Sequence, residues 1–385
     1  MNRSGKIRVV ILGEFPLQGL PLAPSRVATA GGTCTWLLSL AKEWKDQADL
    51  EIHWGVLSKE TAVPCQEQCW GQTFHILPTR GSLRMRGFYR QDRKALSRLI
   101  QQLRPDVVHG WGSEDIYGWS ALSSGRPHLV SVQGILRRYV CQPAIFHPKV
   151  YVLAFMEKYL FQKAQLLTVE TPWGEEQIRR WAPQANIQVL EYGIQRHFFD
   201  ISWKPEKPSA AIFVGTLDPN KGVEDLVEAF RSPRLQNHEL WVVGTGGRFA
   251  DRLRSRATRN VRWFGRLSSE ETAARIARAT CLALPTRNDT SPNVIKEARV
   301  LGLPVLTTTC GGQRSYLIDG EDGYVLQPGN IPETLEKLCR LLQEPDLAEK
   351  LGARGRDRYR ELFRPEKTAN AFLSIYRQLS AQTHT

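Results

Sequence analysis

The 385-residue sequence contains no apolar run that approaches the ~20 residues a membrane-spanning helix needs. Its first apolar run, at residues 7–12, is short and is followed by Glu14. A secretory signal has a longer apolar region and a small-residue cleavage site, so we interpret 7–12 as a buried first strand. These absences favour a cytoplasmic protein, which could still be peripheral to the inner face of a membrane.

Cysteine is also sparse. There are seven cysteines, an odd number, and Cys65 and Cys69 form the one close pair. A structural zinc site needs four neighbouring Cys or His ligands, and no second pair or His cluster completes one here. We therefore expect reduced thiols and no structural metal.

Acidic residues are outnumbered by basic ones, 39 to 52, which gives a formal net charge of +13. Such an excess predicts an anionic partner: nucleic acid, a membrane surface or a phosphorylated substrate. The stretch 80–98 concentrates seven basic residues against one acid, Asp92, and its second half has an apolar stripe at helical spacing. It is typical of a basic amphipathic helix that lies on anionic lipid, or of the solvated face of an ordinary domain helix.

Short β-rich runs alternate with helical patterns along the whole chain, which predicts an α/β fold with two doubly wound domains in tandem. A linker rich in Pro and Lys, at 203–209, separates the two series. The predicted domains are 1–203 and 204–365, with a C-terminal helix at 366–385 that packs back towards the first domain. We expect strands at 7–12, 51–57, 73–77, 107–109, 128–132, 166–170, 187–190, 210–214, 239–243, 261–264, 281–284 and 305–308, and helices at 33–45, 90–103, 223–231, 249–256, 269–279, 292–301 and 334–342, with a helical pattern over 347–379.

The segment 282–304 carries the clearest chemistry. A strand ends at Pro285, a loop carries Asp289, and a helix begins near Ser291, which we expect to be its N-cap before Pro292. Free N–H groups at a helix start bind anions. Glu297 lies about 9 Å further along the helix, at ~1.5 Å per residue. Two carboxylates beside an anion site would suit a diphosphate joined to polyhydroxyl rings, although Asp289 could instead support the turn and Glu297 could be a surface residue.

Other strand-to-helix turns have glycines that permit close approach of a phosphate. Gly215 to Gly222 follows a strand and contains Lys221, which offers a point charge. The turn at 244–247 follows another strand, and Gly31 and Gly32 precede the first helix. Each turn alone is ordinary, but together they favour phosphate binding.

These motifs, in this order, resemble family 4 of the retaining glycosyltransferases (glycosyl transferases group 1). The resemblance is specific over 214–328, through Gly215, Lys221-Gly222, 243–246, 260–265, 291–298, 302–305, 311–312 and 319–325. It is weaker in the first half, through Gly31-Gly32, 104–109, 132–134 and 192–194. The resemblance implies the GT-B fold, in which two Rossmann-like domains face each other across a cleft.

The resemblance also implies roles for particular residues. Glu297 would hold the nucleotide ribose, and Asp289 the transferred sugar. Lys221 would meet the diphosphate, and with Asp289 and Gln133 it forms the expected catalytic set. The remaining expected donor contacts are Gly31, Gly32, Gly215, Thr216, Gly246, Ser291, Pro292, Asn293 and Val294, and the expected acceptor contacts are His109, Arg137 and Arg138.

The implied reaction transfers a sugar from a nucleotide diphosphate to a hydroxyl acceptor, with retention at the anomeric carbon and with no metal or other cofactor. The acceptor would be a glycan, a lipid or a small molecule, as in polysaccharide biosynthesis. Lys221 and backbone dipoles would neutralise the leaving group.

Three positions depart from the family pattern. Asp289 stands where the family usually has Glu, and Thr216 stands where an Arg usually accompanies the lysine. Gln133 stands where the family has a His; its amide can form hydrogen bonds but, unlike a His, cannot titrate near neutral pH. Arg137, Arg138 or Arg287 could supply the missing phosphate clamp. The departures keep open a second hypothesis, a degenerate family member that binds a sugar nucleotide or a partner without turnover.

Two other classes fit less well. A nucleic-acid-binding protein would rest on charge alone, because the sequence has no recognition motif and no basic patch interleaved with aromatics. A nicotinamide dehydrogenase would need a dinucleotide fingerprint at the first strand-to-helix turn, where Gly13 is instead followed by Glu14, Phe15 and Pro16.

Overall fold

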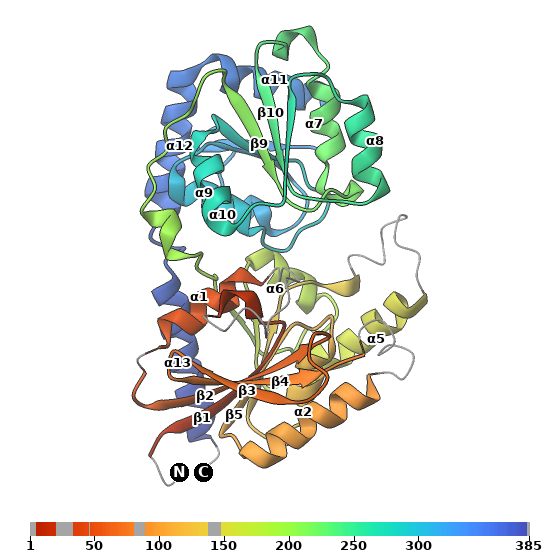
Figure 1. The fold of residues 1–385 in the computed structure, drawn as a ribbon, viewed down its shortest axis with the longest axis vertical. Helices are drawn as coiled ribbons and strands as arrows, with labels where there is room; N and C mark the ends of the chain where they lie inside the picture. Colours follow the sequence, from red (N-terminus) through yellow and green to blue (C-terminus); the bar gives the residue numbers. More distant parts are fainter. Residues whose placement is uncertain (1–4, 21–33, 46, 81–88, 138–147, 383–385) are drawn as a thin grey trace. The chain divides into compact units, whose positions relative to one another are not determined.

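The computed structural model describes residues 5–20, 34–45, 47–80, 89–137 and 148–382. It divides into two compact units, unit 1 (residues 1–193 and 365–385) and unit 2 (residues 194–364) (Figure 1). The sequence predicted the first boundary ten residues later. Trp203 explains the difference, because its indole Nε1 donates to the backbone oxygen of Ala279, 2.7 Å away, and so ties the predicted linker to unit 2.

Unit 1 contains an eight-stranded sheet in the order β3-β4-β2-β1-β5-β6-β7-β8. All neighbours are parallel except β3, which pairs antiparallel with β4 at the edge. The strands are β1 Ile7–Leu12, β2 Leu50–Ser58, β3 Cys65–Cys69, β4 Gln72–Pro78, β5 Val107–Trp111, β6 His128–Val132, β7 Leu167–Val169 and β8 Ile187–Val189.

Helices cover both faces of this sheet, as burial of a parallel sheet requires. One face packs on the apolar sides of α2, α3, α5 and α6, and the other on α1 and α13. The helices are α1 Thr35–Glu43, α2 Arg90–Leu103, α3 Ile116–Leu122, α5 Pro148–Lys163, α6 Pro172–Arg179 and α13 Pro365–Ala381, with a short 3-10 helix η1 at Leu17–Gly19.

The last helix, α13, belongs to unit 1 although it follows unit 2 in the sequence. The indole Nε1 of Trp44, the residue just after α1, donates to the backbone oxygen of Ala369 on α13 at 3.2 Å, and Phe372 and Tyr376 pack against the same indole. Buried apolar side chains on one face of α13 therefore complete the core of unit 1.

Unit 2 contains a six-stranded, fully parallel sheet in the order β11-β10-β9-β12-β13-β14. Its strands are β9 Ala210–Val214, β10 Glu239–Val243, β11 Val261–Gly265, β12 Cys281–Leu284, β13 Val305–Thr308 and β14 Gly323–Leu326. Its helices are α7 Val223–Ala229, α8 Arg248–Arg256, α9 Ser269–Arg278, α10 Asn293–Leu301, α11 Ile331–Gln343 and α12 Pro345–Tyr359, with 3-10 helices η4 Arg196–Phe199, η5 Pro219–Lys221, η6 Pro233–Leu235 and η7 Gly312–Tyr316.

The order of these strands positions the candidate site. β9 and β12 are neighbours, with Ala211 opposite Cys281 and Ile212 opposite Leu282. Their carboxyl ends therefore lie side by side, and the loops that follow them meet. In parallel α/β sheets this edge is where ligands bind.

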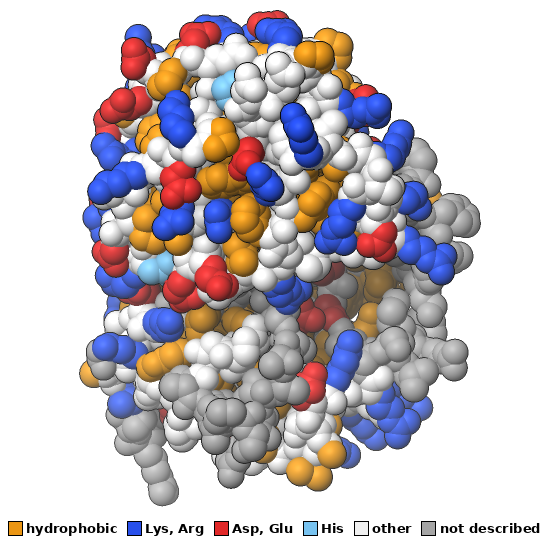
Figure 2. All heavy atoms as spheres, turned by 45° about the horizontal axis from the view of Figure 1, so that its top comes forward, with side chains coloured by type: hydrophobic (Ala, Val, Ile, Leu, Met, Phe, Trp, Pro, Cys, Tyr) orange, Lys and Arg blue, Asp and Glu red, His pale blue; other side chains and the backbone are white. Residues whose placement is uncertain are grey.

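The basic excess does not gather in one patch on the face that Figure 2 displays, where Lys and Arg are interspersed with Asp and Glu. Within the described residues no helix is both long and apolar enough to cross a bilayer. The six cysteines that the structure describes are free thiols, and Cys65 and Cys69 lie at the two ends of edge strand β3.

Candidate donor site

The first loop of the site follows β9 and ends in η5, the 3-10 helix that carries Lys221. Asp218 caps η5, its carboxylate accepting from the backbone N–H of Asn220 at 2.8 Å. Gly222 follows in the left-handed region, with φ +70°. A Cβ at this position would lie 2.1 Å from the backbone oxygen of Pro285, so only glycine lets the loop after β9 touch the loop after β12.

Hydrogen bonds join these two loops. The backbone oxygen of Asn220 accepts from the N–H of Arg287 at 2.6 Å and from the hydroxyl of Thr286 at 3.1 Å. Arg287 also donates to Asp225 at 2.8 Å and to the backbone oxygen of Pro219 at 3.1 Å. Arg287 therefore braces η5 against α7, which occupies the guanidinium that the sequence offered as a phosphate clamp.

Lys221 and Asp289 form an ion pair between the two loops. The lysine side chain is 28% exposed and the aspartate 15%, so the pair is accessible to a ligand while largely shielded. The backbone oxygen of Asp289 accepts from the N–H of Gly312 at 2.9 Å, which fixes the loop on its other side. The structure thus brings together two residues of the expected catalytic set that are 68 positions apart in the chain.

Helix α10 begins beside this pair. The sequence predicted Ser291 as its N-cap, and this prediction is wrong: the N-cap is Pro292, with no side-chain cap. The Ser291 hydroxyl instead lies 2.6 Å from the hydroxyl of Tyr316. It therefore pairs with a residue distant in sequence and does not cap the helix. Consequently the first two N–H groups of α10, on Asn293 and Val294, have no hydrogen-bond partner among the described residues. These N–H groups can donate hydrogen bonds to a bound anion.

Glu297 lies in the second turn of α10 and is half-buried. Burial raises the pKa of its carboxyl from 4.5 to about 7, against the attraction of the neighbouring Lys296 ammonium. Lys296 is itself fully buried, over the rings of Tyr316 and Phe363. The raised pKa means that Glu297 is poised to ionise at neutral pH, where hydroxyl groups of a ligand would favour the carboxylate.

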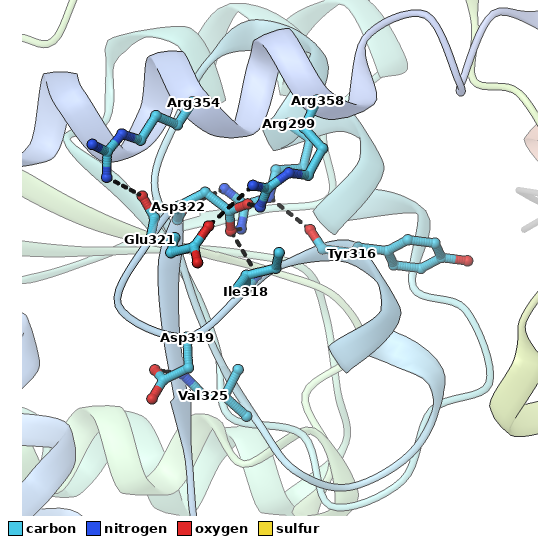
Figure 3. Close-up of polar contacts among 9 residues, drawn as sticks. All are labelled: Arg299, Tyr316, Ile318, Asp319, Glu321, Asp322, Val325, Arg354 and Arg358. Carbon is cyan, nitrogen blue, oxygen red and sulfur yellow. Dashed lines mark hydrogen bonds and ion pairs between the residues drawn. The ribbon is translucent and has the colours of Figure 1, made fainter.

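A buried network supports α10 from within unit 2 (Figure 3). Arg299 and Asp322 are both fully buried and lie 3.2 Å apart, and Arg358 reaches the second carboxylate oxygen of Asp322 at 2.5 Å. Arg299 Nε also donates to the backbone oxygen of Tyr316 at 3.0 Å. The network therefore holds η7, with Tyr316 and its contact to Ser291, against the helix that carries Glu297.

The glycine turns of unit 2 that the sequence assigned to donor binding lie at the same edge of its sheet, at the carboxyl ends of the strands. A Cβ on Gly246 would lie 2.3 Å from the backbone oxygen of Leu217, and one on Gly244 would lie 1.8 Å from that of Gly215. The turns after β9 and β10 therefore pack backbone against backbone. Thr216 is exposed on this surface, and its backbone oxygen accepts from Asp218 at 3.1 Å.

The expected residues of unit 1 differ among themselves. His109 is fully buried, with Nδ1 2.8 Å from the Tyr376 hydroxyl and Nε2 2.7 Å from the Ser131 hydroxyl. Burial lowers its pKa from 6.5 to about 3. Both ring nitrogens are used inside the core, which leaves none for the acceptor contact expected from the sequence. Arg137 is exposed and stacks over Trp181, whereas Arg138, Gly31 and Gly32 lie outside the described residues.

Gln133 follows directly after β6 and is half-buried. The next residue, Gly134, accepts at its backbone oxygen from the Ser113 hydroxyl, which also approaches Glu157 at 2.6 Å. Burial raises the pKa of the Glu157 carboxyl to about 8. The strand end that carries Gln133 is thus pinned by a buried acid that sequence reasoning missed.

Four supporting residues, Arg299, Tyr316, Asp322 and Glu157, escaped the sequence analysis. Asp322 lies within the motif at 319–325, which contributed to the family resemblance, but the sequence assigned Asp322 no role. Arg299 lies one helical turn after Ile295, on the same face of α10, and both side chains are fully buried. A charge inside an apolar stripe is the pattern that could have indicated a buried ion pair.

Known proteins resemble the chain along most of its length. The Glycosyl transferase 4-like domain matches residues 31–193, and the Glycosyl transferases group 1 model matches residues 195–358. Glycogen synthase of Mycobacterium tuberculosis is 26% identical over 233 residues, which cover 57% of this chain and 56% of that protein. The chain spans about half the length of the curated relatives it matches.

Solved structures agree in fold. Sucrose-phosphate synthase from Thermosynechococcus elongatus superposes with a TM-score of 0.82 at 19% identity, over 98% of this chain and all of that chain. Anabaena HepE in complex with UDP and glucose has a TM-score of 0.70 at 14% identity, over 96% of this chain and 99% of that one. Consecutive matches to both family models, together with these folds, place the chain in the group 1 family of GT-B glycosyltransferases, as its motifs predicted.

Proposed function

We propose that this protein transfers a sugar from a nucleotide diphosphate sugar to a hydroxyl acceptor, with retention at the anomeric carbon. The observation that carries the proposal is the Lys221–Asp289 ion pair beside the uncapped start of α10. A cation and the positive end of a helix meet there, at the carboxyl ends of two adjacent parallel strands. This arrangement suits a diphosphate better than an uncharged ligand.

In the proposed reaction Lys221 exchanges part of its contact with Asp289 for the diphosphate of the donor. The N–H groups of Asn293 and Val294 bind the same group, and together they stabilise the charge that develops as the sugar–phosphate bond breaks. Asp289, released from Lys221, accepts from hydroxyls of the transferred sugar, and Glu297 accepts from the ribose. We keep Gln133 in the catalytic set because the family resemblance assigns it there.

The named relatives support the donor class. HepE has been solved with UDP and glucose, and the other matches include a sucrose-phosphate synthase and a glycogen synthase. These proteins differ in their products, so they leave open a glycan, a lipid or a small molecule as the acceptor. We expect a role in the synthesis of polysaccharide or of another glycoconjugate.

We also propose that no metal or other cofactor takes part. Lys221 and the helix start provide the positive charge that a metal would otherwise supply to a diphosphate. Free thiols at the described cysteines fit a reducing compartment, so the proposed location is the cytoplasm.

The proposal is tested by incubating the full chain with UDP-, GDP- and ADP-activated sugars, with and without simple hydroxyl acceptors and EDTA. Donor consumption is followed by release of the nucleotide diphosphate, and the anomeric configuration of the product by proton NMR. We expect turnover of at least one donor, an unchanged rate in EDTA and a retained configuration. An inverted product would contradict the retaining reaction.

The alternative is a binding protein without turnover. Two observations favour it: Thr216 offers no guanidinium, and Arg287 is committed to Asp225 and Pro219. It predicts micromolar binding of a nucleotide sugar in calorimetry, with no hydrolysis or transfer from any donor in the panel.

A further inference from the structure

Unit 1 contains a basic pocket of about 390 Å³ between helices α2 and α3. The side of α2 contributes Arg90, Arg93, Lys94 and Ser97, and α3 with the residue after it contributes Ser120 and Ser123. Among the described residues, no acidic side chain lines it. The pocket therefore joins three cations to several hydroxyl groups, which is the chemistry that binds a phosphate.

The three cations have no internal function that would explain them. Arg90, Arg93 and Lys94 are exposed and form no ion pair with any residue that the structure describes. They lie in the first half of α2, where the helix dipole disfavours positive charge and attracts anions. The acid in this half, Asp92, is buried and accepts from the Thr79 hydroxyl at 3.0 Å. An anion in the pocket would relieve the repulsion among the three.

Ser120 is the second, independent observation. Its side chain is 9% exposed, and its hydroxyl oxygen is buried without a hydrogen-bond partner in the described part of the chain. Buried hydroxyls are almost always hydrogen bonded, because leaving one unpaired is costly. Ser120 lines the pocket, so a ligand with acceptor oxygens would satisfy it there.

An exposed apolar stripe on the neighbouring helix indicates where such a ligand comes from. On α5, Phe155 is 77% exposed, Val152 50% and Tyr151 43%. Tyr159, one turn further, stacks on Trp119 of α3, the residue before Ser120. Apolar side chains of α2, α3 and α5 belong to one core cluster on the same face of the sheet. A phosphate pocket beside exposed aromatic residues is typical of a surface that binds lipid headgroups and enters the acyl boundary.

We propose that this pocket binds the phosphate of an anionic phospholipid, and that the α5 stripe inserts beside it, so that unit 1 docks on a membrane. The basic helix predicted from the sequence thereby becomes a defined headgroup site. This docking is independent of the proposed transfer reaction, because neither α2 nor α5 carries a residue of the donor site.

The test is flotation of the full chain with vesicles of phosphatidylcholine alone or with added phosphatidylglycerol. The variant Arg90→Gln/Arg93→Gln/Lys94→Gln removes the pocket charge. Its matched control, Arg252→Gln/Arg256→Gln/Arg259→Gln, removes the same charge from exposed arginines of unit 2 that have no ion pair to a described residue. At about 1 kcal/mol per basic residue, we expect the pocket variant to bind anionic vesicles about a hundredfold more weakly and the control to bind them normally.

Ser120→Ala distinguishes binding in a defined phosphate pocket from non-specific attraction by surface charge. It removes a hydroxyl that has no hydrogen-bond partner among the described residues, so folding should be unaffected, while vesicle binding should weaken about tenfold or more through one lost hydrogen bond to a charged group. Phe155→Ser should weaken vesicle binding but not binding of inorganic phosphate. Equal losses in the control variant, normal vesicle binding by Ser120→Ala, or binding of inorganic phosphate without binding of vesicles would each overturn the proposal.

Discussion

The carboxyl edges of the two sheets make different use of their polar residues. In unit 2, Lys221 and Asp289 lie in loops beyond the ends of β9 and β12, where they remain partly exposed. In unit 1, His109 lies within β5, and its side chain is enclosed by α13 with both nitrogens occupied. A motif residue inside a buried parallel strand serves the core, whereas one just past the strand end can reach a ligand. The comparison predicts that substitution of His109 lowers the stability of unit 1, whereas substitution of Lys221 or Asp289 impairs binding and reaction of the donor.

The largest expected effect is on the support of the donor site. Asp322→Ala leaves Arg299 charged and buried without its carboxylate, and such a change costs about 3–5 kcal/mol. Urea unfolding should show this loss of stability. The control Glu228→Ala breaks the exposed pair with Arg231 and should cost less than about 1 kcal/mol. Similar losses in both variants would contradict the assigned role of the network.

Lys221→Ala tests the donor side of the comparison. Loss of the charge that faces the diphosphate should lower kcat/KM by about 10²–10³-fold, as removal of one stabilising group does elsewhere. Lys350→Ala, an exposed lysine on α12, is the matched control and should be normal. Steady-state assays with the best donor would measure both, and near-normal activity of the Lys221 variant would refute its role.

His109→Phe tests the core side of the comparison. An aromatic ring is kept, but the buried Tyr376 hydroxyl loses its contact with His109, which costs about 1–3 kcal/mol for an unsatisfied group, whereas the Ser131 hydroxyl keeps Thr168 at 2.6 Å. Thermal unfolding should show the loss. The KM for the acceptor should stay unchanged at temperatures where the variant is folded. A raised KM with no loss of stability would instead support the sequence-based prediction that His109 contacts the acceptor.

The smallest effect concerns pH. With a pKa of about 7, roughly a tenth of the Glu297 carboxyls are ionised at pH 6 and nine-tenths at pH 8. Because ligand hydroxyls donate to the carboxylate, affinity for a nucleotide sugar should rise up to about tenfold between these values. Calorimetry at both pH values measures the change. Glu297→Gln should bind more weakly at pH 8 and lose the dependence; an unchanged pH profile in this variant would assign the titration to another group.

Much of the fold could be predicted because apolar patterns record which strands are buried. The bounds of β1, β6, β9, β10, β12 and β13, and of α2, are those that the sequence predicted. Strand β3 escaped because it is an edge strand with mostly exposed polar residues and no apolar alternation. Strand β14 escaped because four residues, Gly323–Leu326, are too short to show a period.

The site was predictable to the extent that it depends on local sequence. The position of a helix start, a lysine turn and two carboxylates could be read along the chain. The hydrogen-bond partners of these residues could not be predicted from the sequence. Ser291 lost its predicted capping role to Tyr316, and Arg287 is held by Asp225, because contacts across 25 and 62 residues depend on strand order. Likewise the adjacency of β9 and β12, which pairs Lys221 with Asp289, is a property of the sheet.

The most direct test of the central claim is calorimetric titration of the full chain with UDP-, GDP- and ADP-glucose. We predict that at least one binds with a micromolar Kd and that Lys221→Ala and Glu297→Ala each weaken that binding at least tenfold at pH 8, whereas exposed controls Lys350→Ala and Glu349→Ala on α12 bind normally. Equal binding by the site variants and the controls would contradict a donor site at the start of α10.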